Sequence, residues 1–441
     1  MQTFRVSTCV AALSRTSLAR LIAASAVGIS CAGSSETQVI QVEQAVQHRE
    51  YTTAAALYTH KGRDPRVLRA LAENLLLDAA QSTDPAQRRA ALIELSLAGR
   101  RADDLLERLT REAQSPLLLA EVLRLRLAHG DESAREPLRS LLSNRDPEVV
   151  DCAYAALKPD TDWLLLNDGL AAPRSQRRAV ALKLVAAGPR TRLAELRELS
   201  RRDPEPSLRA AALAALTYYG AAASPVFEAA LREHDPDERV RVTALEGLAR
   251  VDPKLALPHL DQQLGAGVSS ESIAAASALL RMQPRQPPER AWMTLQNALS
   301  TPDAALRAHA ASVLAGLDLN AASVPHSVLE ERLRVEPVHS VRLALALALG
   351  TRDSAAYATL VALSKSATLT GVEANAALAD AFAPAEARLL ALRGHPSAIV
   401  RATVARVLVG RGRGAGAVAE LMGDGEWRVR LAAAGAALGG L

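Results

Sequence analysis

An arginine placed six residues after an acidic turn residue recurs along this 441-residue chain. It occurs in "RDPEPSLRAAALAALTYYG" at 202–220 and again in "HDPDERVRVTALEGLAR" at 234–250. The full pattern is met by three pairs: Asp203 with Arg209, Asp235 with Arg241, and Asp424 with Arg430. Degenerate copies keep the arginine without the Asp, at Arg307, Arg342 and Arg401. Successive copies lie about 30 residues apart, so the chain is predicted to be an array of repeats.

Each copy of the repeat is predicted to form two helices. In the second helix of one copy, Val242, Leu245 and Leu248 recur at three-residue steps and form one apolar stripe. We expect Asp235 to cap this helix and Pro236 to occupy its first turn. A single helix pair cannot bury its own apolar face, so neighbouring pairs must stack into a solenoid.

Composition supports an all-α fold. Hydrophobic residues make up 49% of the chain but aromatic residues only 3%, which suits closely packed helices better than strands. The formal net charge is +4, from 52 basic and 48 acidic side chains. This near balance gives no basis for an electrostatic nucleic-acid binder.

The repeats resemble HEAT repeats, including the bacterial HEAT-like units also found in phycobilin lyases. In that family, an Asp between the two helices and an Arg six residues later form a ladder of hydrogen bonds along the stack. The resemblance implies this structural role for the three pairs named above and an α-solenoid over residues 64–441. Copies before about residue 170 depart most from the family pattern.

Residues 1–31 have the pattern of an export signal. Arg5, Arg15 and Arg20 precede the short apolar run "LIAASAVGIS", which ends at Cys31. This segment resembles a bacterial lipoprotein signal, which implies lipidation of Cys31 and an outer-membrane lipoprotein facing the periplasm or the cell surface. Gly28 departs from the pattern of such signals, in which a Leu or a similar residue usually stands three places before the cysteine. The alternatives are ordinary signal cleavage, which would yield a secreted or periplasmic soluble protein, and no processing.

Residues 32–63 are predicted to form a separate helical pair. Tyr51, Ala55 and Tyr58 lie on one face of its second helix. We expect this pair to cap the first apolar face of the solenoid.

The sequence contains no recognisable catalytic, cofactor or metal site. The nine histidines show no paired ligand spacing, and neither an HExxH nor a GxSxG motif is present. Cys152 is alone in the body of the chain, within an apolar helix, so we expect a small buried hydrophobe rather than a nucleophile.

We therefore expect an exported, membrane-anchored scaffold of the bacterial cell envelope that binds one or more proteins. It would have no enzymatic activity, no cofactor, no nucleic-acid partner and no small-molecule substrate. Two alternatives remain, a HEAT-like chromophore or cofactor lyase acting on an acceptor protein and a HEAT-like nucleic-acid-binding protein. The export signal argues against both.

Overall fold

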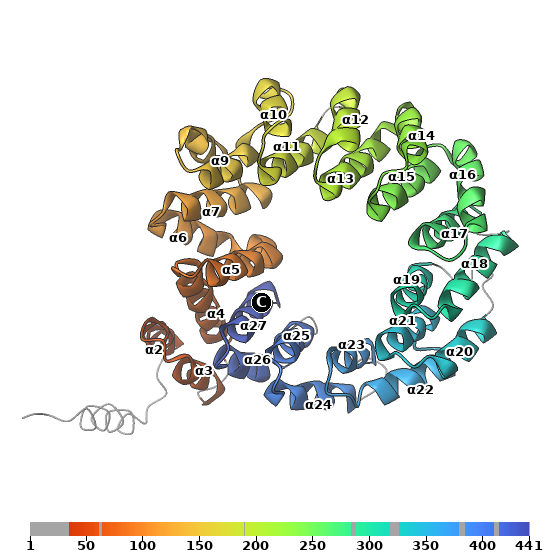
Figure 1. Cartoon of the computed structure of the whole chain (residues 1–441). Helices are drawn as coiled ribbons and strands as arrows, with labels where there is room; N and C mark the ends of the chain where they lie inside the picture. Colours follow the sequence, from red (N-terminus) through yellow and green to blue (C-terminus); the bar gives the residue numbers. More distant parts are fainter. Residues whose placement is uncertain are drawn as a thin grey trace, which may run out of the picture.

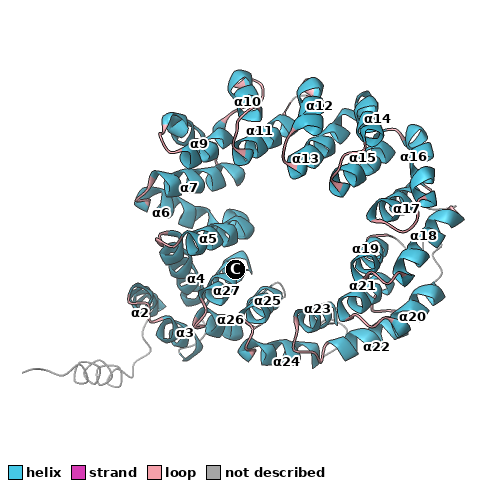
Figure 2. Ribbon diagram, in the orientation of Figure 1, coloured by secondary structure: helices cyan, strands magenta, loops and turns pink. Residues whose placement is uncertain are grey.

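The computed structural model describes seven stretches of the chain: residues 35–60, 64–188, 190–283, 288–317, 326–378, 384–409 and 414–440. The predicted signal segment and Cys31 lie outside them. Every regular element in these stretches is helical, so the predicted all-α solenoid is confirmed (Figure 2).

The helices after residue 64 alternate between an outer row and an inner row (Figure 1). The outer row contains α4 (Pro65–Ala80), α6 (Asp103–Glu112), α8 (Arg135–Ser140), α10 (Trp163–Leu170), α12 (Leu193–Arg202), α14 (Ser224–Glu233), α16 (Pro253–Gly265), α18 (Glu289–Ser300), α20 (His326–Val335), α22 (Ser354–Leu363), α24 (Pro384–Ala391) and α26 (Ala415–Met422). The inner row contains α5 (Pro85–Ala98), α7 (Pro116–Ala128), α9 (Pro147–Ala153), α11 (Ser175–Ala187), α13 (Pro206–Leu216), α15 (Glu238–Val251), α17 (Ser270–Met282), α19 (Ala304–Ala315), α21 (His339–Leu349), α23 (Leu369–Leu378), α25 (Ala398–Val409) and α27 (Trp427–Gly440).

Helix starts follow from the turn residues. Asp64, Asp84 and Asp146 each cap a helix whose first residue is proline, and each accepts a hydrogen bond from the backbone N–H two residues later. The expected cap at Asp235 is wrong. Helix α15 begins at Glu238, and its cap is Asp237, whose side chain accepts from the Arg239 N–H. Asp235 lies two residues earlier, which frees its carboxylate to bind another repeat.

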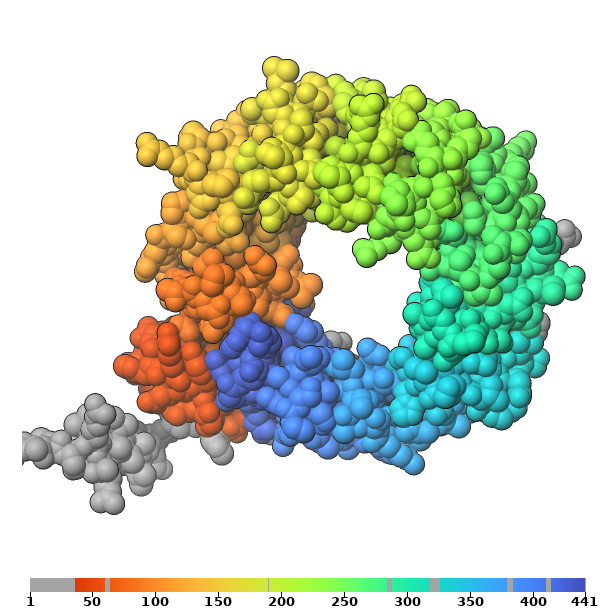
Figure 3. All heavy atoms as spheres, viewed as in Figure 1, coloured from red at the N-terminus to blue at the C-terminus, as the bar shows by residue number. Residues whose placement is uncertain are grey.

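The solenoid closes on itself. Helix α27 packs against α4 and α5, and α26 packs against α3 (Tyr51–His60) and α4. We call this contact between α3–α5 and α25–α27 the closure interface. A single apolar cluster contains buried side chains from both ends, among them Leu71, Leu95, Leu431 and Leu438. The result is a ring with an opening through its middle (Figures 1 and 3).

The helical pair before residue 64 lies at this closure. Helix α2 (Ser35–Gln47) packs on α3 and α4, and α3 also packs on α26. Ala55 and Tyr58 are buried, as is Val42 on α2. The pair therefore covers part of α4 and also contacts the last repeat.

One described stretch, Pro206–Glu233, is long and apolar enough by length and composition to cross a membrane. It comprises α13, the 3-10 segment Thr217–Ala223 and α14. Gly220 breaks it with a φ of 58°, where the chain turns from the inner row to the outer row. The stretch is thus the two helices of adjoining repeats, with Phe227 and Leu213 in the core.

Candidate functional site

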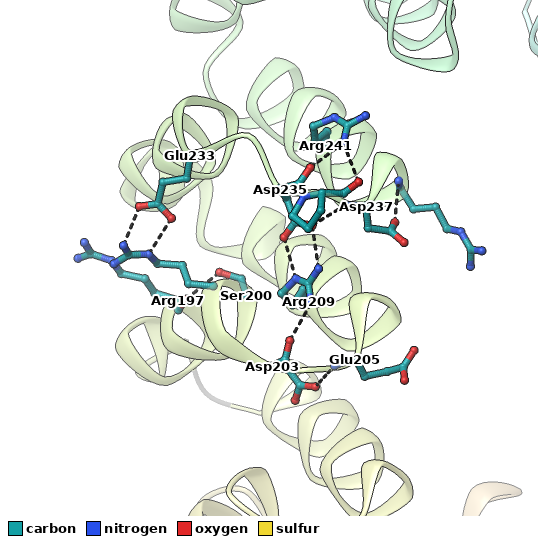
Figure 4. Close-up of polar contacts among 12 residues, drawn as sticks. Arg197, Ser200, Asp203, Glu205, Arg209, Glu233, Asp235, Asp237 and Arg241 are labelled. Carbon is teal, nitrogen blue, oxygen red and sulfur yellow. Dashed lines mark hydrogen bonds and ion pairs between the residues drawn. The ribbon is translucent and has the colours of Figure 1, made fainter.

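The arginines of the repeat bind two successive turns at once (Figure 4). Arg209 donates from Nη1 to the carbonyl oxygen of Asp203, 2.8 Å away in its own repeat. Its Nε and Nη2 donate to the two carboxylate oxygens of Asp235 in the next repeat, at 2.7 and 2.8 Å. Asp235 also accepts from the Asp237 N–H at 2.9 Å. This two-point pairing fixes the relative position of adjacent helix pairs.

The same arrangement recurs along the ring, and we call the series the ladder. Its arginine–carboxylate pairs are Arg178 with Asp203, Arg209 with Asp235, Arg241 with Glu271, Arg307 with Glu336, and Arg401 with Asp424. In each, the arginine bonds to the carboxylate of the following repeat. Within one repeat, the link runs from the arginine side chain to the backbone carbonyl six residues earlier, as from Arg241 to Asp235 and from Arg430 to Asp424.

Sequence reasoning missed two members of the ladder. Arg178 lies six residues after Ala172 and takes the register of the other arginines, binding both oxygens of Asp203 at 2.7 and 3.0 Å. The register alone could have identified it. Glu271 stands inside α17 rather than in the turn before it, and it accepts from Arg241 at 2.5 Å. No pattern in the sequence indicated that Glu271 would take the place of the acidic turn residue.

Three of the ladder carboxylates, those of Asp235, Glu336 and Asp424, are held in their charged form because their pKa values are lowered. Burial alone would raise the pKa of Asp235, but the hydrogen bonds from Arg209 and the Asp237 N–H, together with the charges of Arg209 and Arg241, outweigh it and lower the pKa. The pKa of Asp424 is lowered in the same way, with Arg401 and the Glu426 N–H outweighing burial. A carboxylate fixed in this way is a structural ion rather than a general acid or base.

The last arginine of the ladder contacts the first helical pair. Arg430 belongs to α27, the last helix that the structure describes, and its guanidinium lies over the ring of Tyr51 on α3, 4.1 Å from the ring centroid. The Tyr51 hydroxyl donates to Asp78 of α4 at 3.2 Å. The stacking of repeats thus continues from the C-terminal end of the solenoid into its N-terminal end.

A second polar contact crosses the closure interface. Arg406 on α25 bonds to Glu94 on α5. The Glu94 side chain is 7% exposed and that of Arg406 is 48% exposed. Burial raises the pKa of Glu94, and the charge and hydrogen bond of Arg406 only partly offset this.

A groove of about 300 Å³ lies beside this pair. Ile93 of α5, Ile399 of α25 and Trp427 of α27 contribute its apolar wall, with Arg406 and Arg428 among its other residues. The groove combines an acid, an aromatic ring and two arginines. Its carboxylate, Glu94, is already bound by Arg406, and Arg428 is paired with Glu426 at 3.3 Å. Both arginines of the groove are therefore already paired with an acid.

Large apolar side chains are exposed on the inner row. Ile93 and Leu97 lie four residues apart on one face of α5, and Leu97 is 69% exposed. Leu347 on α21 and Ile399 on α25 are also exposed. Because outer-row helices cover one side of each inner helix and neighbours cover its flanks, the remaining face borders the central opening (Figure 3). That face is a surface of the kind that binds proteins.

The described residues hold no group of three or more His, Cys, Asp or Glu side chains that could bind a metal ion. Cys152 on α9 is half-buried rather than fully buried as expected. Burial raises the pKa of its thiol to about 11. The thiol is therefore protonated at neutral pH and is a poor nucleophile.

Comparison with a family model agrees with this architecture. Residues 193–281, from α12 to α17, match the family model of HEAT repeats. A crystal structure of an engineered protein is 19% identical over 83% of this chain and 97% of that one, with a TM-score of 0.29. No match was found among curated proteins. Residues 193–281 are thus similar to HEAT repeats, and repeats of this kind generally mediate protein interactions.

Proposed function

We propose that this protein is a non-enzymatic scaffold of the bacterial cell envelope, which holds a partner protein against the inner face of its ring. The observation that supports partner binding most directly is the set of exposed apolar side chains on the inner row, Ile93, Leu97, Leu347 and Ile399. Ile93 and Ile399 line one groove, and Leu97 lies one helical turn from Ile93; an exposed apolar patch of this kind often marks a site of protein interaction. The ladder supports a rigid surface over the repeats that it ties together, from α11 to α17, from α19 to α21 and from α25 to α27.

The cellular location rests on the sequence of residues 1–31. Their arginines, short apolar run and Cys31 support export followed by lipidation, which would tether the ring to the outer membrane. Several acyl chains on one cysteine hold a protein firmly at a bilayer, whereas a single chain holds it weakly.

Partner binding is tested by photo-crosslinking in the intact cell. A photoreactive amino acid replaces Leu97 on the inner face, and the matched control replaces Leu164 on outer helix α10, which is 80% exposed. We expect a reproducible cross-linked protein from position 97 and none, or a different set, from position 164. The Leu97→Asp variant should then lose this partner while its circular dichroism is unchanged. Equal capture from both positions would contradict binding at the inner face.

Export is tested by mass spectrometry of the N-terminal peptide of the native protein. A diacylated Cys31 in the membrane fraction would support the lipoprotein proposal, and Cys31→Ala should accumulate as an unprocessed precursor. An intact Met1 in a soluble fraction would contradict export and would favour the lyase and nucleic-acid alternatives.

A further inference from the structure

The groove at the closure interface is an uncovered continuation of the apolar cluster that joins the two ends of the chain. Ala402 of α25 and Leu431 of α27 line the groove and are buried members of that cluster. Ala90 of α5 and Trp427 of α27 also line the groove and pack against the cluster. Both ends of the solenoid therefore build the groove, which is complete only where they meet.

Exposed aliphatic side chains stand on both sides of α27 at this groove. Helix α27 packs against α5 on one side and against α25 on the other (Figure 1). Ile93 of α5 and Ile399 of α25 both line the groove, and each is more than half exposed. An apolar side chain in the groove would remove surface of both from water. The groove volume of about 300 Å³ is at the lower end of the range for small-molecule pockets, which suits a single large side chain.

The charged side chains that line the groove are each held by a contact within the chain. Glu94 bonds to Arg406, and Arg428 pairs with Glu426 at 3.3 Å. The Arg428 guanidinium also lies over the Trp427 ring, 4.5 Å from the ring centroid. A charged occupant would have to compete with these contacts, whereas an uncharged apolar side chain leaves them in place. The chemistry of the groove therefore favours an aliphatic or aromatic occupant.

We propose that the groove binds a large uncharged apolar side chain of the partner protein, and that this binding is coupled to closure of the ring. The occupant contacts α5 together with α25 and α27, so it binds the closed ring more tightly than a ring whose ends have separated. The coupling is reciprocal, so the partner stabilises the closure interface by the factor by which closure strengthens binding. That the occupant comes from a partner protein rests on the proposed function, whereas the apolar chemistry and the dependence on closure do not.

Binding is tested on the full chain by fluorine NMR after incorporation of fluorotryptophan. The chain has three tryptophans, so Trp427 reports on the groove, Trp163 and Trp292 are internal controls, and Trp427→Phe assigns the signal. The probe is N-acetyl-L-leucinamide, and the matched polar control is N-acetyl-L-serinamide. We expect N-acetyl-L-leucinamide alone to shift the Trp427 signal, and Ile399→Asp should abolish the shift.

Three results would overturn the apolar site. The Trp427 signal would not move, or it would move equally in Ile399→Asp, or it would respond more strongly to N-acetyl-L-aspartate than to N-acetyl-L-leucinamide. The last result would show that the groove binds an anion.

The coupling is tested with two substitutions at the closure interface, neither of which lines the groove. Gly435→Ala places a Cβ atom 2.5 Å from the Cβ of Glu94 and should separate α27 from α5. Tyr51→Ala removes the ring that lies against Arg430 and should loosen α3 from α27 more mildly. Gly425→Ala and Tyr218→Ala are the matched controls.

Spin labels at Thr53 of α3 and Ala415 of α26, both exposed, measure how far each variant opens the ring. We expect the short label distance and the Trp427 response to be lost together, and the probe to restore part of the short distance. A normal Trp427 response in a chain with a long label distance would show that the groove does not depend on closure. A short distance that persists in the double variant Tyr51→Ala with Gly435→Ala would contradict the packing on which the coupling depends.

The contribution to partner binding is read from the photo-crosslink at position 97, one helical turn from Ile93. Ile399→Asp and Gly435→Ala should both reduce that cross-link, and Gly425→Ala should not. If position 97 captures no partner in the natural chain, the scaffold proposal fails while the NMR result stands. If capture is strong and Ile399→Asp leaves it unchanged, the scaffold proposal survives and the groove is not the contact.

Discussion

Glu94 on α5 and Arg406 on α25 form an ion pair although 312 residues separate them in the sequence. The pair exists because the two ends of the solenoid meet. Around it, α27 packs on α4 and α5, and Arg430 lies over Tyr51. A superhelix that rose with each repeat would keep these groups far apart, so the closure interface defines the shape of the protein.

Gly435 allows the close approach of α27 to α5. A Cβ atom at this position would lie 2.5 Å from the Cβ of Glu94, which the backbone of α5 fixes. Gly435→Ala should therefore separate the two helices and lower the free energy of unfolding by about 1–3 kcal/mol, despite the better helix propensity of alanine. The control is Gly425→Ala, since a Cβ there meets nothing within 4 Å. Urea unfolding of both variants measures the difference, and equal stability would contradict the packing described.

The ladder pairs should contribute far more to stability than the outer ion pairs. Arg209→Gln leaves the carboxylate of Asp235 mostly buried without its main partner, and we expect a loss of about 3 kcal/mol. The matched control is Arg201→Gln, which removes an ion pair to Glu233 whose side chains are 36% and 49% exposed, and should cost at most about 1 kcal/mol. A double-mutant cycle with Asp235→Asn isolates the interaction. A similar loss in both arginine variants would contradict the structural role of the ladder.

Acid should weaken the protein through the ladder. The pKa values of Asp235, Glu336 and Asp424 are lowered in the folded protein, because arginine and backbone hydrogen bonds outweigh burial. The unfolded chain therefore takes up protons first, and stability falls as pH drops from the usual carboxyl range, about pH 4, through the lower folded values. Urea unfolding from neutral pH to about pH 3 measures this loss, which Asp235→Asn should reduce.

Glu94 should act in the opposite direction. Its pKa is raised in the folded protein, mainly by burial, so the folded state binds a proton first as pH falls through that value. This uptake adds stability on acidification. Glu94→Gln removes the effect, and the variant should lose stability more steeply with acid than the natural chain does. A shallower acid loss in Glu94→Gln would contradict the burial of this carboxyl.

Cys152 should react slowly with thiol reagents. Since burial raises its pKa to about 11, only about one molecule in a thousand or fewer carries the thiolate near neutral pH. Alkylation by iodoacetamide in the folded protein should be much slower than in urea, where the thiol is exposed. Equal rates would show that the α9 environment does not protect it.

The repeating register allowed the sequence to predict the helix pairs and the solenoid. Period and apolar stripes depend on neighbours within a repeat, and the sequence shows these directly. The ladder partners are harder, because the sequence places Asp235 six residues from Arg241 while its carboxylate pairs with Arg209 of the previous repeat. The sequence also predicted that Asp235 caps α15. The helix starts two residues later than expected, so its cap is Asp237.

Closure could not be predicted from the sequence. It depends on the small rotation and rise between successive repeats, summed around the whole ring, and no local pattern encodes that sum. No sequence pattern in their own helices marks Glu94, Gly435 or Arg406 as a residue of the closure interface. Only the folded chain shows that they meet.

The closed ring is tested most directly by pulsed dipolar spectroscopy between spin labels. One label pair spans the closure interface, at Thr53 of α3 and Ala415 of α26, both exposed, and a control pair joins Lys183 and Tyr218 within the stack. The labels are introduced with Cys9, Cys31 and Cys152 replaced by serine. The closed ring predicts a single short distance for both pairs, as expected for neighbouring helices whose axes lie about 10 Å apart. A long, broad distribution across the closure interface, with a short distance in the control pair, would show an open solenoid and contradict the ring.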